Sequence, residues 1–478
     1  MSMSTNSSTQ LRPDAIGVWH VVFFVVAAAA PLTAVVGASP AAFAFGNGAG
    51  TPGTYLIVGL LYLLFSVGFT AMNRFVGTAG GFYPYIANGL GRPAGVAGAF
   101  IAIATYNAID IAVYGLFGFF VADMVKSAGG PDIHWLFYAA LLGIAVFLCG
   151  MRNIEFSGKL LGYCMVAEIA ILLLLGLAIL IGGGGPEGVT LSAFGPQAIF
   201  APGFGVSLVF VVASFIGFEA TAIFGEEARD PKRTIPRATY LAVIVIAVFY
   251  AFATWTVALN YGPSNIAAEA TANTATLYLT AIQTRLGPLA GLAMNLLLIT
   301  SLFACALSFH NTINRYFYAI GREGLVWAGF ARTHADHQSP YVAGAVQSVI
   351  ALGAAALFAL GGQDPYAVVF AWMGTFASIG ILVVQILVSL AVIGFFRADA
   401  RGVGIGHRLV APALSIVGLG ACLAFMIANL SLVSGSESPV VNAFPVLVVA
   451  IGVAGYVFAR WLRSVRPAVY ENLGRAFG

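Results

Sequence analysis

Three carboxylic acids, Asp110, Glu168 and Glu219, lie inside long apolar stretches of this sequence. No lysine or arginine lies at a comparable depth within those stretches to neutralise them. If the stretches cross a membrane, a charged group there costs roughly 2.5–3.5 kcal/mol on insertion scales. Each acid must then be protonated, hydrated or engaged by a ligand, which makes each a candidate functional residue.

Glu219 directly follows an interruption of its apolar stretch at Gly217 and Phe218. The first apolar stretch is interrupted at Pro31, which lacks a backbone hydrogen-bond donor. A broken helix exposes carbonyl groups that accept from an ammonium group and N–H groups that bind a carboxylate. Two matching breaks therefore point to a shared binding site, whereas a proline kink taken alone is more often a packing feature.

We therefore predict a substrate site at the two breaks and on the helix that carries Asp110. Its residues are Ala29, Ala30, Pro31, Leu32, Thr33, Asn107, Asp110, Ser214, Phe215, Ile216, Gly217, Phe218 and Glu219.

Asp110 shares one face of its predicted helix with Asn107 and Tyr114, because residues three and four apart lie on the same side. A polar face at membrane depth is expected to look into the helix bundle or a cavity. An ionised Asp110 could pair with a cationic group of the substrate. Internal polar packing is the alternative interpretation.

Composition places the chain in a lipid bilayer. It has 478 residues, of which 60% are hydrophobic and only 8% are charged, whereas a soluble domain carries about 25% charged residues. A spanning helix needs about 20 apolar residues, and we predict an all-α integral membrane protein with twelve transmembrane helices. The predicted spans are about 18–46, 54–76, 94–125, 134–150, 160–182, 204–225, 239–260, 288–314, 341–361, 365–395, 408–433 and 442–462.

The positions of the basic residues predict the orientation. With a cytoplasmic N-terminus, nineteen of the 21 Lys and Arg residues fall on the inside, and only Lys126 and Arg285 fall outside. Such an excess is typical of cytoplasmic segments. We expect a multi-pass protein of the cytoplasmic (inner) membrane, with cytoplasmic tails at 1–17 and 463–478.

The two breaks lie in the first and the sixth predicted span, five spans apart. This spacing favours two inverted five-helix repeats, 18–182 and 204–395, with two appended helices within 408–462.

Three segments between spans resemble those of one transporter family. GEEARDPKRTIPRA at 225–238 resembles the segment after helix 6 in the amino acid–polyamine–organocation (APC) superfamily, where a G-F-E motif is followed by E-E, D-P and R-x-I-P. TAGGFYPYIANGLGRPAG at 78–95 and the segment 311–343 are similar to the loops after helices 2 and 8. The resemblance implies the leucine-transporter-like inverted-repeat fold and secondary transport of amino acids or related amines such as polyamines.

One feature departs from this family. Many members carry a Gly-Ser/Ala-Gly run in helix 1, through which a substrate carboxylate approaches the backbone, but this chain has AAAAPLT. Recognition of the α-carboxylate is then altered, or the substrate lacks that group.

Glu168 occupies a position in helix 5 that resembles the lysine of a VxxIK motif in some proton-coupled relatives. A buried carboxylate there could take up and release a proton near neutral pH. We predict proton coupling by Glu168 and Glu219. A structural hydrogen bond from Glu168 to helix 1 is the alternative.

The charged segment 226–237 follows the second break. We predict that Glu226, Glu227 and Arg229 form a cytoplasmic gate, with Arg315 or Arg74 as possible partners; a solvated charged loop is the other interpretation.

The sequence contains no Walker motif, channel filter or metal-binding spacing, and no nucleophile–base arrangement. We therefore expect no enzyme, no cofactor, no metal and no nucleic-acid partner. The predicted function is import of an amino acid or small amine by proton symport with alternating access. An amino acid exchanger (antiport) is the alternative, and a non-transporting membrane sensor is the alternative from a different class.

Overall fold

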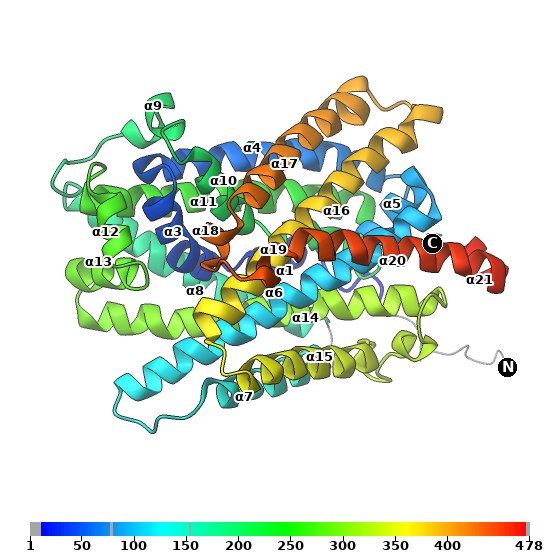
Figure 1. Ribbon diagram of the computed structural model, residues 1–478, viewed down its shortest axis with the longest axis horizontal. Coiled ribbons are helices and arrows are strands. Elements are labelled where there is room, and N and C mark those ends of the chain that lie inside the picture. Colours follow the sequence, from blue (N-terminus) through cyan, green and yellow to red (C-terminus); the bar gives the residue numbers. More distant parts are fainter. Residues whose placement is uncertain (1–10, 77–79, 153, 475–478) are drawn as a thin grey trace.

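Figure 1 shows the computed structural model of the chain, which describes residues 11–76, 80–152 and 154–474. Its regular structure is helical, and these ranges contain two isolated bridges but no β-strand. The long helices run side by side along the longest axis. At one end lies α21 (Pro467–Asn472), and at the other lie α12 (Ile266–Ala272) and α13 (Leu277–Leu286). We call these the α21 end and the α12 end.

The elements that precede the second break are α1 (Val18–Ala29), α2 (Pro31–Thr33), η2 (Ala34–Ala38), α3 (Ser39–Phe45), η3 (Gly48–Gly50), α4 (Thr51–Asn73), α5 (Phe82–Leu90), α6 (Arg92–Ser127), α7 (Trp135–Gly150), α8 (Ile154–Ile181), η4 (Ser192–Phe194), α9 (Pro196–Ile199) and α10 (Phe204–Ala213).

The remaining elements are η5 (Phe218–Phe224), α11 (Pro231–Tyr261), α12, α13, α14 (Pro288–Arg322), η6 (Ala328–Ala331), α15 (Tyr341–Leu360), η7 (Pro365–Phe370), α16 (Ala371–Ala398), η8 (Gly406–Val410), α17 (Ala411–Ala428), α18 (Leu430–Ser434), α19 (Pro439–Asn442), α20 (Phe444–Val465) and α21.

Eleven helices in the described ranges are long and apolar enough to cross a membrane, so the chain is a multi-pass membrane protein. They match eleven of the predicted spans. The twelfth, 134–150, coincides with α7, which is apolar but has only 16 residues. At a rise of 1.5 Å per residue, α7 covers about 24 Å, less than the roughly 30 Å of a hydrocarbon core.

The first span is broken at Ala30. Helix α1 ends at Ala29, Ala30 adopts a left-handed conformation with φ 46°, and α2 begins at Pro31. Proline is favoured at the first position of a helix, where its missing N–H would have no intrahelical partner. Pro31 therefore begins the second half of the broken helix.

The second break lies between α10 and η5. Gly217 has φ 118°, which strains any residue with a side chain. A Cβ atom built on Gly217 would lie 2.6 Å from the Cβ atom of Ala28. The two breaks therefore face one another, and glycine permits their close approach.

Some predicted regions lie outside the described residues. These are positions 1–10 of the N-terminal tail, positions 78–79 of the motif after the second span, and positions 475–478 of the C-terminal tail.

Candidate substrate site

A cavity of about 390 Å³ lies against both breaks. Residues 28–30 line it from the first break, and Ser214 and Ile216 line it from the second. It continues to Phe45 at the end of α3 and to Thr274 between α12 and α13. The cavity therefore extends from the breaks toward the α12 end of the molecule.

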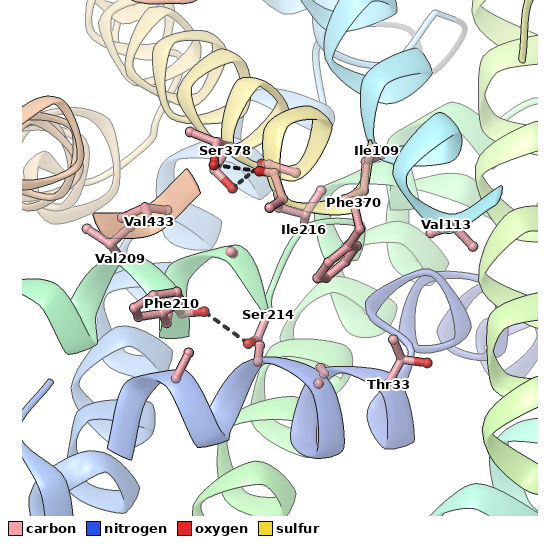
Figure 2. A pocket seen from close by; sticks show the side chains of 18 of the residues that line it. Thr33, Ile109, Val113, Val209, Phe210, Ser214, Ile216, Phe370, Ser378 and Val433 are labelled. Carbon is pink, nitrogen blue, oxygen red and sulfur yellow. Dashed lines mark hydrogen bonds between the residues drawn. The ribbon is translucent and has the colours of Figure 1, made fainter. Parts of the chain in front are cut away.

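The cavity wall is apolar. No Asp, Glu, Lys, Arg or His side chain belongs to the part of the wall that the structure describes. Figure 2 shows Phe210, Phe370, Ile109 and Val113 around it, with the Ser214 hydroxyl donating to the Phe210 carbonyl at 3.1 Å. A substrate bound here would have an uncharged, apolar side chain, and its charged groups would be bound by backbone and hydroxyl groups.

Polar side chains donate hydrogen bonds to the carbonyl groups at the end of α1, where the helix is broken. The Cys305 thiol donates to the Ala28 carbonyl at 3.2 Å, and the Tyr250 hydroxyl donates to the Ala29 carbonyl at 2.9 Å. A carbonyl oxygen has two lone pairs. Each can therefore accept from a substrate ammonium group without losing its present donor.

Glu168 lies behind the first break, on α8. Its Oε2 accepts from the Leu32 N–H at 3.4 Å and from the Ser301 hydroxyl at 2.7 Å. The Thr33 hydroxyl, which lines the cavity, donates to the Ser301 oxygen at 3.1 Å. A chain of hydrogen bonds thus links the cavity to the buried Glu168 carboxyl group.

Glu219 has the corresponding place at the second break. Its two carboxyl oxygens accept from the Gly217 N–H at 3.2 and 3.1 Å, and Oε1 also accepts from the Tyr106 hydroxyl at 2.9 Å. Helix breaks leave backbone N–H groups without intrahelical partners. Each of the two breaks is therefore capped by a buried glutamate.

Asp110 does not line the cavity, although its α6 neighbours Ile109 and Val113 do. It is fully buried and accepts from the Gln347 amide at 2.9 Å. The Asn107 amide donates to the Ile103 carbonyl of its own helix at 2.8 Å. In this conformation Asp110 packs against α15.

The two breaks bring eleven of the predicted substrate-site residues together, but only five line the cavity. These five are Ala29, Ala30, Thr33, Ser214 and Ile216. Phe215 and Phe218 instead pack on Tyr62, with ring centroids 5.1 and 4.8 Å apart. Pro31, Leu32, Gly217 and Glu219 lie behind the wall.

Sequence reasoning missed several parts of the cavity wall, two of which belong to elements that contact α10. One is the start of α16, where Gly374 and Ser378 leave space one turn apart. Small residues at a spacing of four could have indicated this face. The other is residues 432–435 around the end of α18, for which the sequence offers no recognisable signal.

The predicted gate residues lie near the α21 end, where α14 finishes. Arg315 makes a bidentate ion pair with Glu227, with N–O distances of 2.5 and 2.9 Å, and both side chains are at most 3% exposed. Arg322 pairs with Glu226, although burial still raises the pKa of the Glu226 carboxyl.

The chain before α1 is joined to the same segment. The Ile16 N–H donates to the Glu227 carbonyl at 3.0 Å, and the Arg229 N–H donates to the Ile16 carbonyl at 2.8 Å. The Arg229 side chain donates to the Asp14 carbonyl at 2.8 Å. These bonds tie the start of the first span to the segment after the second break.

Two broken, mutually facing helices beside an apolar cavity are features of a membrane transporter for small molecules. The sequence model of the family described as amino acid permease matches residues 20–464. The chain therefore belongs to the amino acid permease family, whose members are transporters and not enzymes.

Individual relatives are more distant. The aromatic amino acid permease FywP of Lactococcus lactis subsp. cremoris (strain MG1363) is 32% identical over 159 residues, 31% of this chain and 34% of the relative. The aromatic amino acid transport protein AroP of Escherichia coli (strain K12) is 27% identical over 128 residues, 25% of this chain and 28% of the relative. An uncharacterized transporter of Mycobacterium tuberculosis (strain ATCC 25618 / H37Rv) is 26% identical over 249 residues, 51% and 48% of the two chains. The chain thus spans between about a quarter and a half of these relatives.

Proposed function

We propose that this permease imports a neutral amino acid with an apolar or aromatic side chain, by alternating access and in symport with a proton. The apolar wall of the cavity, which lacks charged side chains among the described residues, supports an uncharged substrate side chain. The two relatives named as aromatic amino acid transporters support the same class. A polyamine would require acidic groups in the wall, and Glu168 and Glu219 lie behind it.

The proposal includes the predicted fold and orientation. Twelve spans with two inverted five-helix repeats would put both breaks at the midplane, and the charge bias would put the α21 end in the cytoplasm. The cavity then extends toward the outside, and the ion pairs of Glu226 and Glu227 close the cytoplasmic side.

The substrate would bind through both charged groups at the breaks. Its ammonium group would donate to the carbonyls of Ala28 and Ala29, and its carboxylate would approach the N–H groups at the start of α2. Glu168 already accepts from the Leu32 N–H. A charged Glu168 would repel the substrate carboxylate, so a proton on Glu168 and a bound substrate would stabilise each other.

The main support for coupling of transport to a proton is the chain of hydrogen bonds from Thr33 through Ser301 to Glu168. It supplies donors and acceptors along which a proton could pass between the cavity and the buried acid. Glu219 accepts a hydrogen bond from the Gly217 N–H at the second break. It would be a second proton-binding group, whose hydrogen bonds change when the second break moves.

The test is uptake of labelled amino acids and polyamines by purified protein in liposomes, with and without an imposed proton gradient. We expect gradient-driven accumulation of neutral apolar amino acids. The variant Glu168→Gln should keep exchange of labelled for unlabelled substrate but lose accumulation. No uptake of any compound would refute transport, and wild-type exchange that ignores the gradient would establish an antiporter instead.

A matched control is Glu187→Gln, which changes an exposed acid that does not line the cavity. It should accumulate substrate as the wild type does. Unchanged accumulation in Glu168→Gln would remove Glu168 from the coupling mechanism while leaving the substrate assignment intact.

A further inference from the structure

The connection between α17 and α20 lies outside both predicted repeats, yet it lines the cavity. Residues 432–435 contribute to the wall together with α10 and α16. Figure 2 shows Val433 beside Val209 of α10, with Ser378 of α16 on the same side of the cavity. A segment that joins the last two spans therefore forms part of the wall of the candidate substrate cavity.

Buried side chains hold the connection between α17 and α20 in this position. Leu430, Ser434, Val441 and Phe444 are buried, and α18 contacts both α10 and α16. The Phe444 ring packs edge-on against Phe376 of α16 at 5.6 Å. Val433 is thus placed by buried anchors on both sides of it.

Serine side chains satisfy the irregular backbone of this connection. The Ser434 hydroxyl donates to the Leu430 carbonyl at 2.7 Å and accepts from the Ser436 N–H at 3.2 Å. The Ser438 N–H donates to the Ser436 hydroxyl at 3.2 Å. Irregular backbone at membrane depth is tolerated only where its polar groups are satisfied and it is buried or lines a cavity.

The position of Val433 relative to the breaks indicates what it contacts. Val209 precedes Ser214 by five residues, so it lies about 7 Å along the helix axis from the second break. Val209 and Val433 therefore line the part of the cavity that lies beyond the second break. The wall there consists of Val209, Val433 and the small residues of α16, all uncharged.

We infer that α18 forms the specificity wall of this transporter, and that Val433 limits the size of the substrate side chain. The inference rests on the proposed function, because it assumes that an amino acid binds at the two breaks. This wall admits amino acids with apolar side chains. The size of the residue at position 433, together with α10 and α16, determines which apolar side chain fits.

Substitutions at Val433 test the assignment, with Val440 as the matched control. Val440 is 56% exposed, belongs to α19 of the same connection, and does not line the cavity. Initial uptake of phenylalanine, alanine and tryptophan is measured in proteoliposomes for Val433→Phe, Val433→Ala, Val440→Phe and Val440→Ala. Pocket discrimination by one or a few carbon atoms changes selectivity by about tenfold or more.

We expect Val433→Phe to lower the ratio of phenylalanine to alanine uptake about tenfold. Val433→Ala should raise uptake of tryptophan relative to phenylalanine. This variant tests the same wall if the Val433→Phe protein fails to fold, because it shortens the side chain instead of enlarging it. Both Val440 variants should keep the wild-type ratios. Unchanged ratios in an active Val433 variant, or equal changes in the Val440 variants, would overturn the specificity wall alone. Absence of amino acid uptake by the wild type would overturn the proposed function and this inference together.

Discussion

Gly217 is the residue at which the break in the second helix approaches the break in the first. Its φ is 118°, and a Cβ atom at this position would lie only 2.6 Å from the Ala28 Cβ atom, which leaves no room for a side chain. We expect Gly217→Ala to cost about 1–3 kcal/mol in strain and to reduce substrate uptake, because the breaks would be forced apart. Thermal unfolding and uptake in liposomes measure the two effects.

The control for this substitution is Gly353→Ala. Gly353 lies in α15, and a Cβ atom there would meet nothing within 4 Å. Alanine also favours the helix by about 1 kcal/mol over glycine. Gly353→Ala should therefore preserve uptake, and an equal loss in both variants would argue against a special role for Gly217.

The sequence revealed the important acids but not their partners. Asp110, Glu168 and Glu219 stand out because an acid in an apolar run is costly. Their contacts with Gln347, Ser301 and Tyr106 join residues more than 100 positions apart. Hydrogen bonds over such separations depend on how the helices pack, which hydrophobic patterns do not specify.

At the scale of elements, hydrogen bonds join the residues after α21 to α5 and to the end of α14. Glu323, which follows α14, accepts from the Tyr83 hydroxyl at 2.5 Å and from the Gly474 N–H at 3.2 Å. The Asn88 amide of α5 donates to the Gly474 carbonyl at 3.0 Å. We call this arrangement the C-terminal clasp.

The C-terminal clasp should depend on pH. Burial raises the pKa of Glu323 from 4.5 to about 7, although bonds from Tyr83 and Gly474 favour its charged form. Because the pKa is raised in the folded state, the contribution of Glu323 to stability is complete below about pH 4.5 and is lost as the pH rises through about 7. After correction for the intrinsic pH dependence of amide exchange, hydrogen exchange at Leu473 should accelerate between about pH 4.5 and pH 7 and level off above that.

The variant Glu323→Gln should remove most of this pH dependence, because glutamine stays neutral and retains an acceptor oxygen. Glu471→Gln provides the control, since the Glu471 side chain is exposed on the same segment. A Glu323→Gln protein whose Leu473 exchange still accelerates like the wild type would show that another group controls the clasp.

Elements were predicted unequally well from sequence. Long apolar runs indicated the spans, although α11 begins at Pro231 and α14 ends at Arg322, each eight residues beyond the predicted bound. Pro31 and Gly217 marked both breaks, because proline and glycine act on the backbone locally. The α18 wall was not predicted. Its segment reads as part of one long apolar run, and only packing against α16 and α10 brings it to the cavity.

For the whole molecule, the buried pair of Glu227 and Arg315 joins parts of the chain that must separate if the α21 end opens. Glu227 follows the second break, Arg315 belongs to α14, and the Glu227 backbone is bonded to Ile16 before the first break. The Arg315 guanidinium also lies over the Phe224 ring, 5.2 Å from its centroid. The contacts at this end thus join both broken helices and α14.

Removing one partner of a buried ion pair leaves a charge without compensation, which costs about 3–5 kcal/mol. We expect Glu227→Gln to destabilise the closed α21 end, so that a cysteine introduced at Ile16 reacts faster with a thiol reagent supplied from that side. The substitution Glu226→Gln should have a smaller effect, because the Glu226 and Arg322 side chains are 17% and 21% exposed and a partly solvated pair contributes less. Equal reactivity of the Ile16→Cys site in both variants and in the parent would contradict a gating role for Glu227, whereas a rise confined to Glu227→Gln would identify its ion pair as the contact that must break during transport.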